Sequence, residues 1–145
     1  MSGSPYELRF GVEAMDLDRV HGWLTTAYWS PAVTRELVVR AANGASLVVG
    51  AFLGDDQTGY MRVVSDRATF AWICDVFVDP DHRGKGIASM MIQAALDDPG
   101  HQGLRRWVLA TADAHAVYAK LGFEPLPFPD RWMIIRAPHA QPVDI

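Results

Sequence analysis

The ten residues Asp79–Ala88, DPDHRGKGIA, lie between two apolar segments of the chain. A Gly-rich turn that joins a strand to a helix gathers several unpaired main-chain N–H groups at one point, where the helix dipole adds about half a positive charge. Gly84 and Gly86 leave these amides accessible to a phosphate, and Arg83 and Lys85 add charge at the rim. The stretch therefore predicts an anion site, which suits a diphosphate better than a carboxylate.

The common nucleotide-binding patterns do not match this turn. A P-loop ends in Gly-Lys-Ser/Thr, whereas here Lys85 is followed by Gly86 and the required earlier glycine is missing. The Rossmann fingerprint needs a third Gly or Ala at the position where Ser89 stands. Taken alone, the turn is equally well explained as a sharp connection whose charges are solvated.

The segments around the turn have the periodicity of strands and helices. Runs rich in β-branched and aromatic residues precede it, and the sequence GDDQ joins two of them as a hairpin. Strands are predicted at residues 7–12, 46–53, 58–64, 70–78, 107–110 and 133–136. Helices are predicted from the cap Asp16, from Pro31 to the stop Asn43-Gly44, after the turn, and from the cap Asp113. The fold class is therefore α+β, with a mixed, mostly antiparallel central sheet flanked by helices.

Composition limits the class of protein further. The chain has 145 residues, of which 50% are hydrophobic, so residues 1–145 are interpreted as a single domain with one core. A formal charge of -4 gives no basic field for nucleic acid, and no apolar run reaches the ~20 residues of a membrane span. No signal-peptide pattern opens the chain, so a cytoplasmic location is expected. The lone Cys74 and the spacing of the histidines predict neither a disulfide nor a metal site.

A second motif lies after the short strand predicted at residues 107–110. The run AHAVYAKLGF, residues 114–123, places Tyr118 on a helix that ends at Gly122. The tyrosine is therefore one helical turn from a Gly-Phe stop. This second motif comes after the Gly-rich turn in the chain.

Together, the strand VFV, the turn HRGKGIA and the run AxxxYxKLGF resemble the GNAT superfamily of acyl-CoA-dependent N-acyltransferases. The family signature Q/R-x-x-G-x-G/A is met by Arg83, Gly86 and Ala88. The resemblance is specific from about Asp75 to Phe123 and only architectural before that. It implies a GNAT-like fold and an N-acetyltransferase activity.

The resemblance implies acetyl-CoA as the co-substrate. The amides of the turn would hold the CoA pyrophosphate, and the main chain of the preceding strand would pair with the pantetheine arm like an added strand. The implied cofactor-binding residues are Val76, Phe77, Val78, Arg83, Gly84, Lys85, Gly86, Ile87, Ala88, Thr111 and Tyr118. Thr111 stands where the family often has an asparagine. The cofactor contact that the side-chain amide of that asparagine makes is therefore not expected here.

The implied reaction is direct attack of a primary amine on the acetyl carbonyl, without an acyl-enzyme. Tyr118 matches the tyrosine that protonates the departing thiolate, and a tyrosine that only packs on the thioester is the alternative. The glutamate base of some members has no counterpart, because Cys74 stands at its most usual position with Asp75 beside it. Asp75 is the predicted base, directly or through water, since a carboxylate in the apolar strand WICDVFV requires a partner. An acylated Cys74 and a purely structural Asp75 are the alternatives.

The acceptor is the part of the reaction that the sequence describes least. Tyr28, Trp29 and Arg62 are predicted to shape its pocket, because the joint of the first two helices and the third strand border that site in relatives. Core packing is the alternative for these aromatic residues. A small-molecule amine and a peptide amine both remain open as acceptors, and a non-catalytic acyl-CoA-binding sensor or interaction domain is the alternative function. An exposed sheet edge also leaves a homodimer open.

Overall fold

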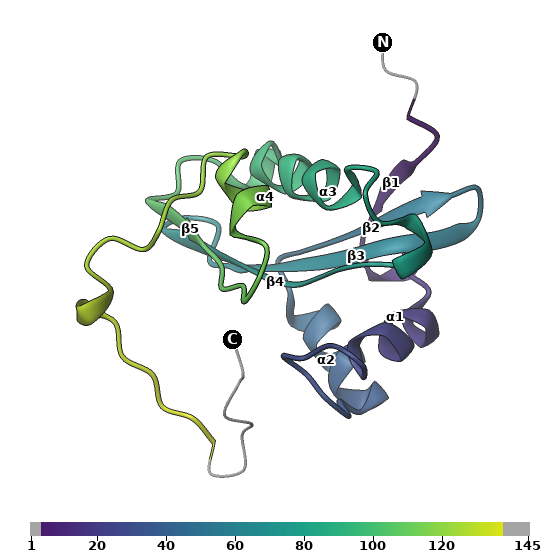
Figure 1. Ribbon diagram of the computed structural model, residues 1–145, viewed down its shortest axis with the longest axis horizontal. Helices are drawn as coiled ribbons and strands as arrows, with labels where there is room; N and C mark the ends of the chain where they lie inside the picture. The colour runs from purple at the N-terminus through teal and green to yellow at the C-terminus, as the bar shows by residue number, and fades with distance from the viewer. Residues whose placement is uncertain (1–3, 138–145) are drawn as a thin grey trace.

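A five-stranded sheet forms the centre of the structure, a computed structural model that describes residues 4–137 (Figure 1). Its strands, in their order across the sheet, are β1 (Glu7–Phe10), β2 (Leu47–Leu53), β3 (Asp56–Ser65), β4 (Phe70–Val78) and β5 (Arg106–Val108). The first four strands pair antiparallel, and β5 joins β4 in parallel. The predicted α+β class with a mixed, mostly antiparallel sheet is confirmed.

Helices cover both faces of this sheet. Helices α1 (Leu17–Leu24) and α2 (Arg35–Gly44) lie on one face, and α3 (Ile87–Leu96) and α4 (His115–Ala119) lie on the other (Figure 1). Within residues 4–137, none of the helices has the length and apolar character needed to cross a membrane.

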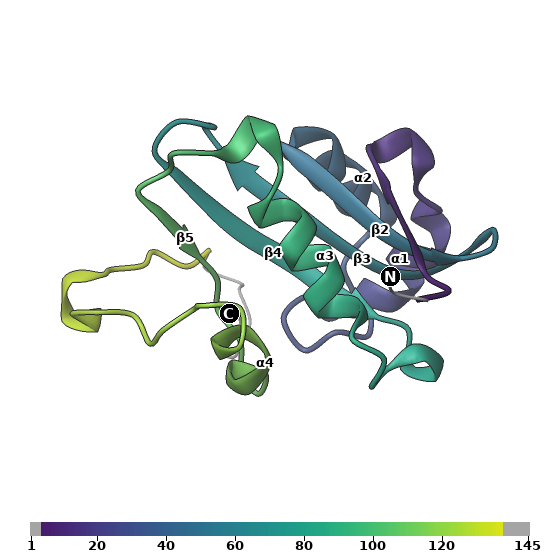
Figure 2. The same ribbon diagram turned by 90° about the horizontal axis from the view of Figure 1, so that it is seen from above.

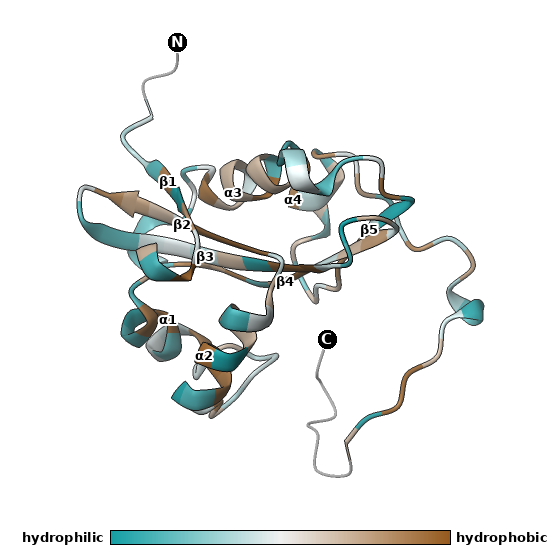
Figure 3. Cartoon of the chain, turned by 180° about the vertical axis from the view of Figure 1, so that it is seen from behind, coloured by the Kyte–Doolittle hydropathy of each residue, from teal (hydrophilic) through white to brown (hydrophobic). Residues whose placement is uncertain are grey.

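The strands contribute to two cores because successive side chains of a strand point to opposite faces. Val49 and Met61 pack with Met91 of α3, whereas Val48 and Tyr60 pack with α1 and α2. All five side chains are almost fully buried. Figure 3 shows α3 largely in the hydrophobic colour, as expected for a helix that lies against a sheet.

The start of α1 agrees with the sequence, and the start of α2 does not. Asp16 accepts a hydrogen bond from the Arg19 amide at 3.1 Å, which confirms the predicted cap. For α2 the cap is Thr34, which accepts from the amide of Leu37 at 3.2 Å, so the prediction that the helix begins at Pro31 is wrong. The helix ends at Gly44, within the predicted stop Asn43-Gly44, but the expected left-handed cap is not formed, because neither residue has a positive φ and the C-cap Ala45 is extended.

A bulge in β4 changes the course of the sheet. Asp75 has a φ of 57°, and between Tyr60 and Arg62 the register with β3 shifts so that β4 carries one extra residue. Beyond residues 70–72 the strands β4 and β5 no longer pair, and they diverge in Figure 2. The edge of β4 from residue 73 to residue 78 is therefore unpaired on this side within the described residues.

The last part of the described chain differs most from its prediction. The strand predicted at residues 133–136 is not formed, and after Phe123 the only regular element up to residue 137 is a 3-10 turn at Pro129–Arg131. The predicted cap Asp113 of α4 is also wrong, because the N-cap residue is Ala114 and no side chain among the described residues caps the helix; Thr111 Oγ1 accepts from the Ala114 amide at 3.1 Å just before it.

Candidate active site

The Gly-rich turn places several free amides at the start of α3. Gly84 and Gly86 have φ values of 79° and 80°, in the left-handed region that favours glycine, and Gly86 is the N-cap of the helix. The main-chain N–H groups of residues 83–88 donate no hydrogen bond within the described chain. Lys85 is exposed beside them. An anion could therefore bind to these amides without displacing an existing acceptor.

Arg83 does not stand at the rim of this turn as predicted. Its Nε donates to the carbonyl oxygen of Val78 at 3.0 Å, and its guanidinium lies 5.3 Å from the centre of the Phe77 ring. The side chain therefore folds back over the end of β4 and connects the turn to the unpaired edge of that strand. The main chain of Val78 was predicted to pair with pantetheine, but its carbonyl oxygen already accepts this hydrogen bond from Arg83.

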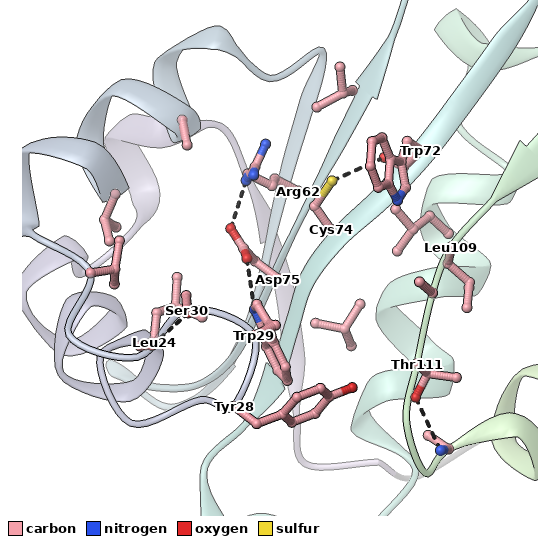
Figure 4. Close-up of a pocket in the computed structure, with 18 of the residues that line it drawn as sticks. Leu24, Tyr28, Trp29, Ser30, Arg62, Trp72, Cys74, Asp75, Leu109 and Thr111 are labelled. Carbon is pink, nitrogen blue, oxygen red and sulfur yellow. Dashed lines mark hydrogen bonds and ion pairs between the residues drawn. The ribbon is translucent and has the colours of Figure 1, made fainter. Parts of the chain in front are cut away.

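A cavity of about 600 Å³ lies beside the open edge of β4 (Figure 4). Its walls come from the joint of α1 and α2, from β3 and β4, and from the segment between β5 and α4. It brings together all of the predicted catalytic and acceptor residues, namely Tyr28, Trp29, Arg62, Asp75 and Tyr118, with two further predicted cofactor-binding residues, Val76 and Thr111. Phe77 and Ile87 are instead buried in the two cores, so only their main chains are available to a ligand.

Asp75 is held by two donors inside this cavity (Figure 4). One carboxylate oxygen accepts from Arg62 Nε at 2.7 Å, and the other accepts from Trp29 Nε1 at 3.0 Å. Burial acts to lower the pKa of Arg62, but the neighbouring Asp75 outweighs it and raises this pKa above its usual value. The carboxylate that was expected to need a partner thus has two, and its contact with Arg62 is a mostly buried salt bridge.

Tyr118 reaches the cavity from α4. Its side chain is half-buried, packs against the α3 core and makes an edge contact with Phe123, the ring centres being 6.1 Å apart. Burial raises the pKa of Tyr118, and Tyr28 and Asp113 raise it further. The phenol is therefore protonated at neutral pH, as a proton donor must be.

Cys74 has the properties of a structural thiol. Burial raises its pKa, and although Arg62 lowers this pKa, the balance remains above the usual thiol value. Its Sγ lies 3.7 Å from the carbonyl oxygen of Trp72. Because the thiolate is the nucleophilic form of cysteine, this environment argues against an acylated Cys74.

The apolar wall of the cavity was not predicted from the sequence. Trp72 lies on one side, and Leu37, Val38 and Ala41 of α2 line the other. The helical spacing of the α2 residues indicated a buried face, but it did not indicate that part of this face borders a cavity. Tyr28 also has an unpredicted contact, since its hydroxyl accepts from the Ala112 amide at 2.8 Å and closes one end of the cavity.

No metal site accompanies these residues. Among residues 4–137, no group of three or more His, Cys, Asp and Glu side chains is arranged to hold a metal ion.

A glycine turn that offers free amides, an open strand edge and a tyrosine-lined cavity are together the features of an acyl-CoA-dependent transferase. The family model of the GNAT acetyltransferases matches residues 12–123, and the chain belongs to this family. A candidate GNAT acetyltransferase from Xanthomonas campestris has a crystal structure that matches with a TM-score of 0.87 and 38% identity, over 92% of this chain and 94% of that one.

Two further proteins are similar to this chain. A candidate acetyltransferase from Deinococcus radiodurans has the same fold, with a TM-score of 0.74 and 20% identity over 94% of this chain and 91% of that one. A candidate acetyltransferase from Gibberella zeae is 33% identical over 66 residues, which are 45% of this chain and 37% of the fungal protein. The match thus spans little more than a third of that curated relative.

Proposed function

We propose that this protein is an N-acetyltransferase that moves the acetyl group of acetyl-CoA to a primary amine by direct attack. The observation that carries the proposal is the unpaired edge of β4, which runs from the free amides of the turn to the cavity that holds Tyr118. Membership of the GNAT family implies acetyl-CoA as the donor.

On the donor side, the amides of residues 83–88 would bind the CoA pyrophosphate. Main-chain groups of Val76, Phe77 and Val78 would pair with the pantetheine arm in the space between the diverging strands. This course leads the thioester toward Tyr118, whose protonated phenol would donate a proton to the departing CoA thiolate. Main-chain N–H groups of the same strand edge would stabilise the oxyanion that forms at the acetyl carbonyl.

On the acceptor side, the amine must lose its proton before or during attack. An alkyl amine with a pKa near 10.4 is mostly protonated at pH 7, and its neutral form costs about 4.6 kcal/mol. Asp75, directly or through water, is the proposed proton acceptor, although both of its oxygens already accept hydrogen bonds. Amines of lower pKa are therefore expected to be the better substrates.

The lining of the cavity supports an acceptor whose amine is attached to an apolar group. Leu37, Val38 and Trp72 form an apolar wall, whereas the charged groups of Arg62 and Asp75 are paired with each other. A small aryl-alkylamine matches this wall better than a polyamine does, because the wall offers only apolar contacts. Asp113 is the other carboxylate of the lining, and it is exposed.

An acyl-CoA-binding domain without turnover is the second candidate, and the engagement of Asp75 by Trp29 and Arg62 favours it. Thiol release from acetyl-CoA, measured across aryl-alkylamines, polyamines and peptides, separates the two functions. The transferase predicts release with the apolar amines. Tight CoA binding without release above background for any amine would leave only the binding domain.

A further inference from the structure

Among the described residues that line the cavity, Arg62 is the only arginine or lysine. A guanidinium has several N–H donors, and Arg62 uses the one on Nε, which it donates to Asp75. The N–H groups on its terminal nitrogens Nη1 and Nη2 donate no hydrogen bond within residues 4–137. Figure 4 shows one of these nitrogens turned away from Asp75. The cavity therefore holds a cation with a free hydrogen-bonding edge.

This free edge of Arg62 restricts which molecules can fill the cavity. The side chain is only 20% exposed, and it shares the cavity with the apolar wall formed by Leu37, Val38 and Trp72. An acceptor that enters displaces water from the guanidinium, and a buried donor without an acceptor atom is destabilising. A hydrocarbon amine leaves the terminal N–H groups in this state, whereas a carboxylate matches their fork.

Asp75 offers the opposite charge to the same molecule. One of its oxygens accepts from Arg62 Nε at 2.7 Å, and the other accepts from Trp29 Nε1 at 3.0 Å. A carboxylate oxygen can accept more than one hydrogen bond, so both oxygens keep capacity for an ammonium. A free amino acid carries its ammonium and its carboxylate on one carbon. The ammonium can thus lie at Asp75 while the carboxylate lies at the free edge of Arg62.

We propose that the acetyl acceptor is a free amino acid with an apolar side chain, whose carboxylate binds to the free edge of Arg62 and whose amine faces Asp75. This inference rests on the proposed transferase function and names its substrate class. The side chain of the amino acid would contact the apolar wall of Leu37, Val38 and Trp72. A simple amine and a peptide amine both lack the neighbouring carboxylate, so Arg62 selects against both.

In this reaction an N–C bond forms and the C–S bond of the thioester breaks. One proton of the ammonium leaves through Asp75 to solvent before attack. A second proton leaves the nitrogen during attack, and the CoA thiolate receives a proton from Tyr118, which solvent then restores. The products are an N-acetyl amino acid and the CoA thiol. Arg62 contacts only the carboxylate and is a specificity-determining residue in this scheme.

A carboxylate that cannot be acetylated tests the Arg62 site without turnover. With CoA present, calorimetry should show that 3-phenylpropionate binds to the wild-type protein at least about tenfold more tightly than 3-phenylpropionamide, because only the acid matches the guanidinium. Equal affinities of the acid and the amide, or no binding of the acid, would overturn the inference. The comparison uses the wild-type protein alone.

A matched pair of variants assigns the effect to Arg62. Arg62→Lys keeps a positive charge but loses the fork, so it should bind 3-phenylpropionate at least about tenfold more weakly than the wild type. The control Arg35→Lys changes an exposed arginine of α2 whose Nε is also paired with an aspartate, Asp18, outside the cavity, and its affinity should be unchanged. Circular dichroism checks that both variants fold; if Arg62→Lys does not, the comparison of acid and amide decides. Equal affinities in the two variants would overturn the inference.

Turnover separates this inference from the proposed function. The kcat/KM for phenylalanine should exceed those for phenethylamine and phenylalaninamide at least about tenfold, although the amide has the least basic amine and would be preferred if loss of a proton alone decided. Equal or faster acetylation of phenethylamine would overturn the inference and leave the transferase intact. Selective binding of 3-phenylpropionate without thiol release from any of the three amines would overturn the transferase but confirm the carboxylate site.

Discussion

Tyr118 and Tyr60 are two tyrosines within the same fold whose hydroxyl groups differ in their surroundings. Tyr118 faces the cavity, whereas Tyr60 is buried in the α1–α2 core and its hydroxyl has no hydrogen-bond partner within the described chain. Burial raises the pKa of both residues, and Asp75 raises that of Tyr60 further. One hydroxyl is therefore available for chemistry, and the other is an energetic cost of the fold.

Replacement of Tyr118 by phenylalanine should lower kcat about 100-fold or more, because a positioned general acid typically contributes at least this factor. The Kd for CoA should change less than about threefold, since packing is kept and only the hydroxyl is lost. Steady-state kinetics and calorimetry measure the two values. Because the pKa of Tyr118 is raised above its usual value, ionisation of this residue should not lower the wild-type rate near neutral pH. An unchanged kcat would remove Tyr118 as the acid.

Replacement of Tyr60 by phenylalanine should raise the free energy of unfolding by about 1 kcal/mol, because an unpaired buried hydroxyl is destabilising. The matched control is Tyr6→Phe, which removes a hydroxyl that is hydrogen-bonded to His82 Nδ1 at 2.9 Å and should lower this free energy. Urea denaturation of the three proteins gives the comparison. A destabilised Tyr60→Phe would mean that its hydroxyl is satisfied in solution.

At the scale of residues, the sequence was informative where a motif fixes the backbone and uninformative where contacts depend on register. The turn glycines and Tyr118 could be located from their patterns. The Arg62–Asp75 pair could not, because it forms across two strands at a bulge made by an aspartate in the left-handed region. A bulge with glycine at that position would have been easier to predict.

The role of the Gly-rich turn before α3 in CoA binding can be tested directly by substitution. Gly86→Val should weaken CoA binding at least tenfold, because a branched side chain at a φ of 80° both strains the N-cap and covers the amides. Gly54→Val is the control, since Gly54 also has a left-handed φ, of 61°, but lies in the β2–β3 turn. Calorimetry with CoA should find a changed Kd for Gly86→Val alone. Equal affinities would mean that the turn is only structural.

The turn between β3 and β4 should make stability depend on pH. Asp66 accepts from the Thr69 hydroxyl and from the amides of Thr69 and Ala68, and these hydrogen bonds hold its pKa well below the usual value. A carboxylate with a lowered folded pKa stabilises the fold above its unfolded pKa of about 3.9, and this contribution is lost as pH falls further.

Asp66→Asn should therefore lower the urea midpoint at pH 7, and its difference from the wild type should shrink between pH 4 and pH 2. The control Asp56→Asn changes an exposed carboxylate of β3 and should show no such trend. A difference that is constant with pH would mean that the charge of Asp66 is not what holds the turn.

The order and type of most helices and strands could be predicted from the sequence, whereas several of their first and last residues could not. The strands of the meander have strong alternation, and β4 was predicted with its observed bounds. The start of α2 was misplaced because Pro31 is a common first residue of a helix, yet Ala32, with a φ of 59°, turns the chain before Thr34 caps it. The strand expected at residues 133–136 has the right composition, but it joins no strand of the sheet within the described residues.

At the scale of the whole molecule, the site exists because two strands separate. The motifs place an anion turn and a tyrosine on consecutive helices, but the distance between them depends on how far β4 and β5 diverge. That divergence follows from the bulge and from the short length of β5, and neither has a strong sequence signal. The donor side could thus be predicted from motifs, whereas the acceptor cavity needed the assembled sheet.

Binding of CoA between β4 and β5 should raise the free energy of unfolding. A fragment of CoA should raise it more, the more tightly the fragment binds. At 100 times its Kd, a ligand raises the free energy of unfolding by about 2.7 kcal/mol, which for a chain of this size is about 5–10 °C in Tm. If the turn holds the diphosphate, the adenosine diphosphate half of CoA should retain more of this shift than pantetheine does at equal concentration. Differential scanning fluorimetry with the three compounds measures the ranking. A larger shift with pantetheine would mean that affinity resides in the strand edge of β4 and that the free amides of the turn contribute little.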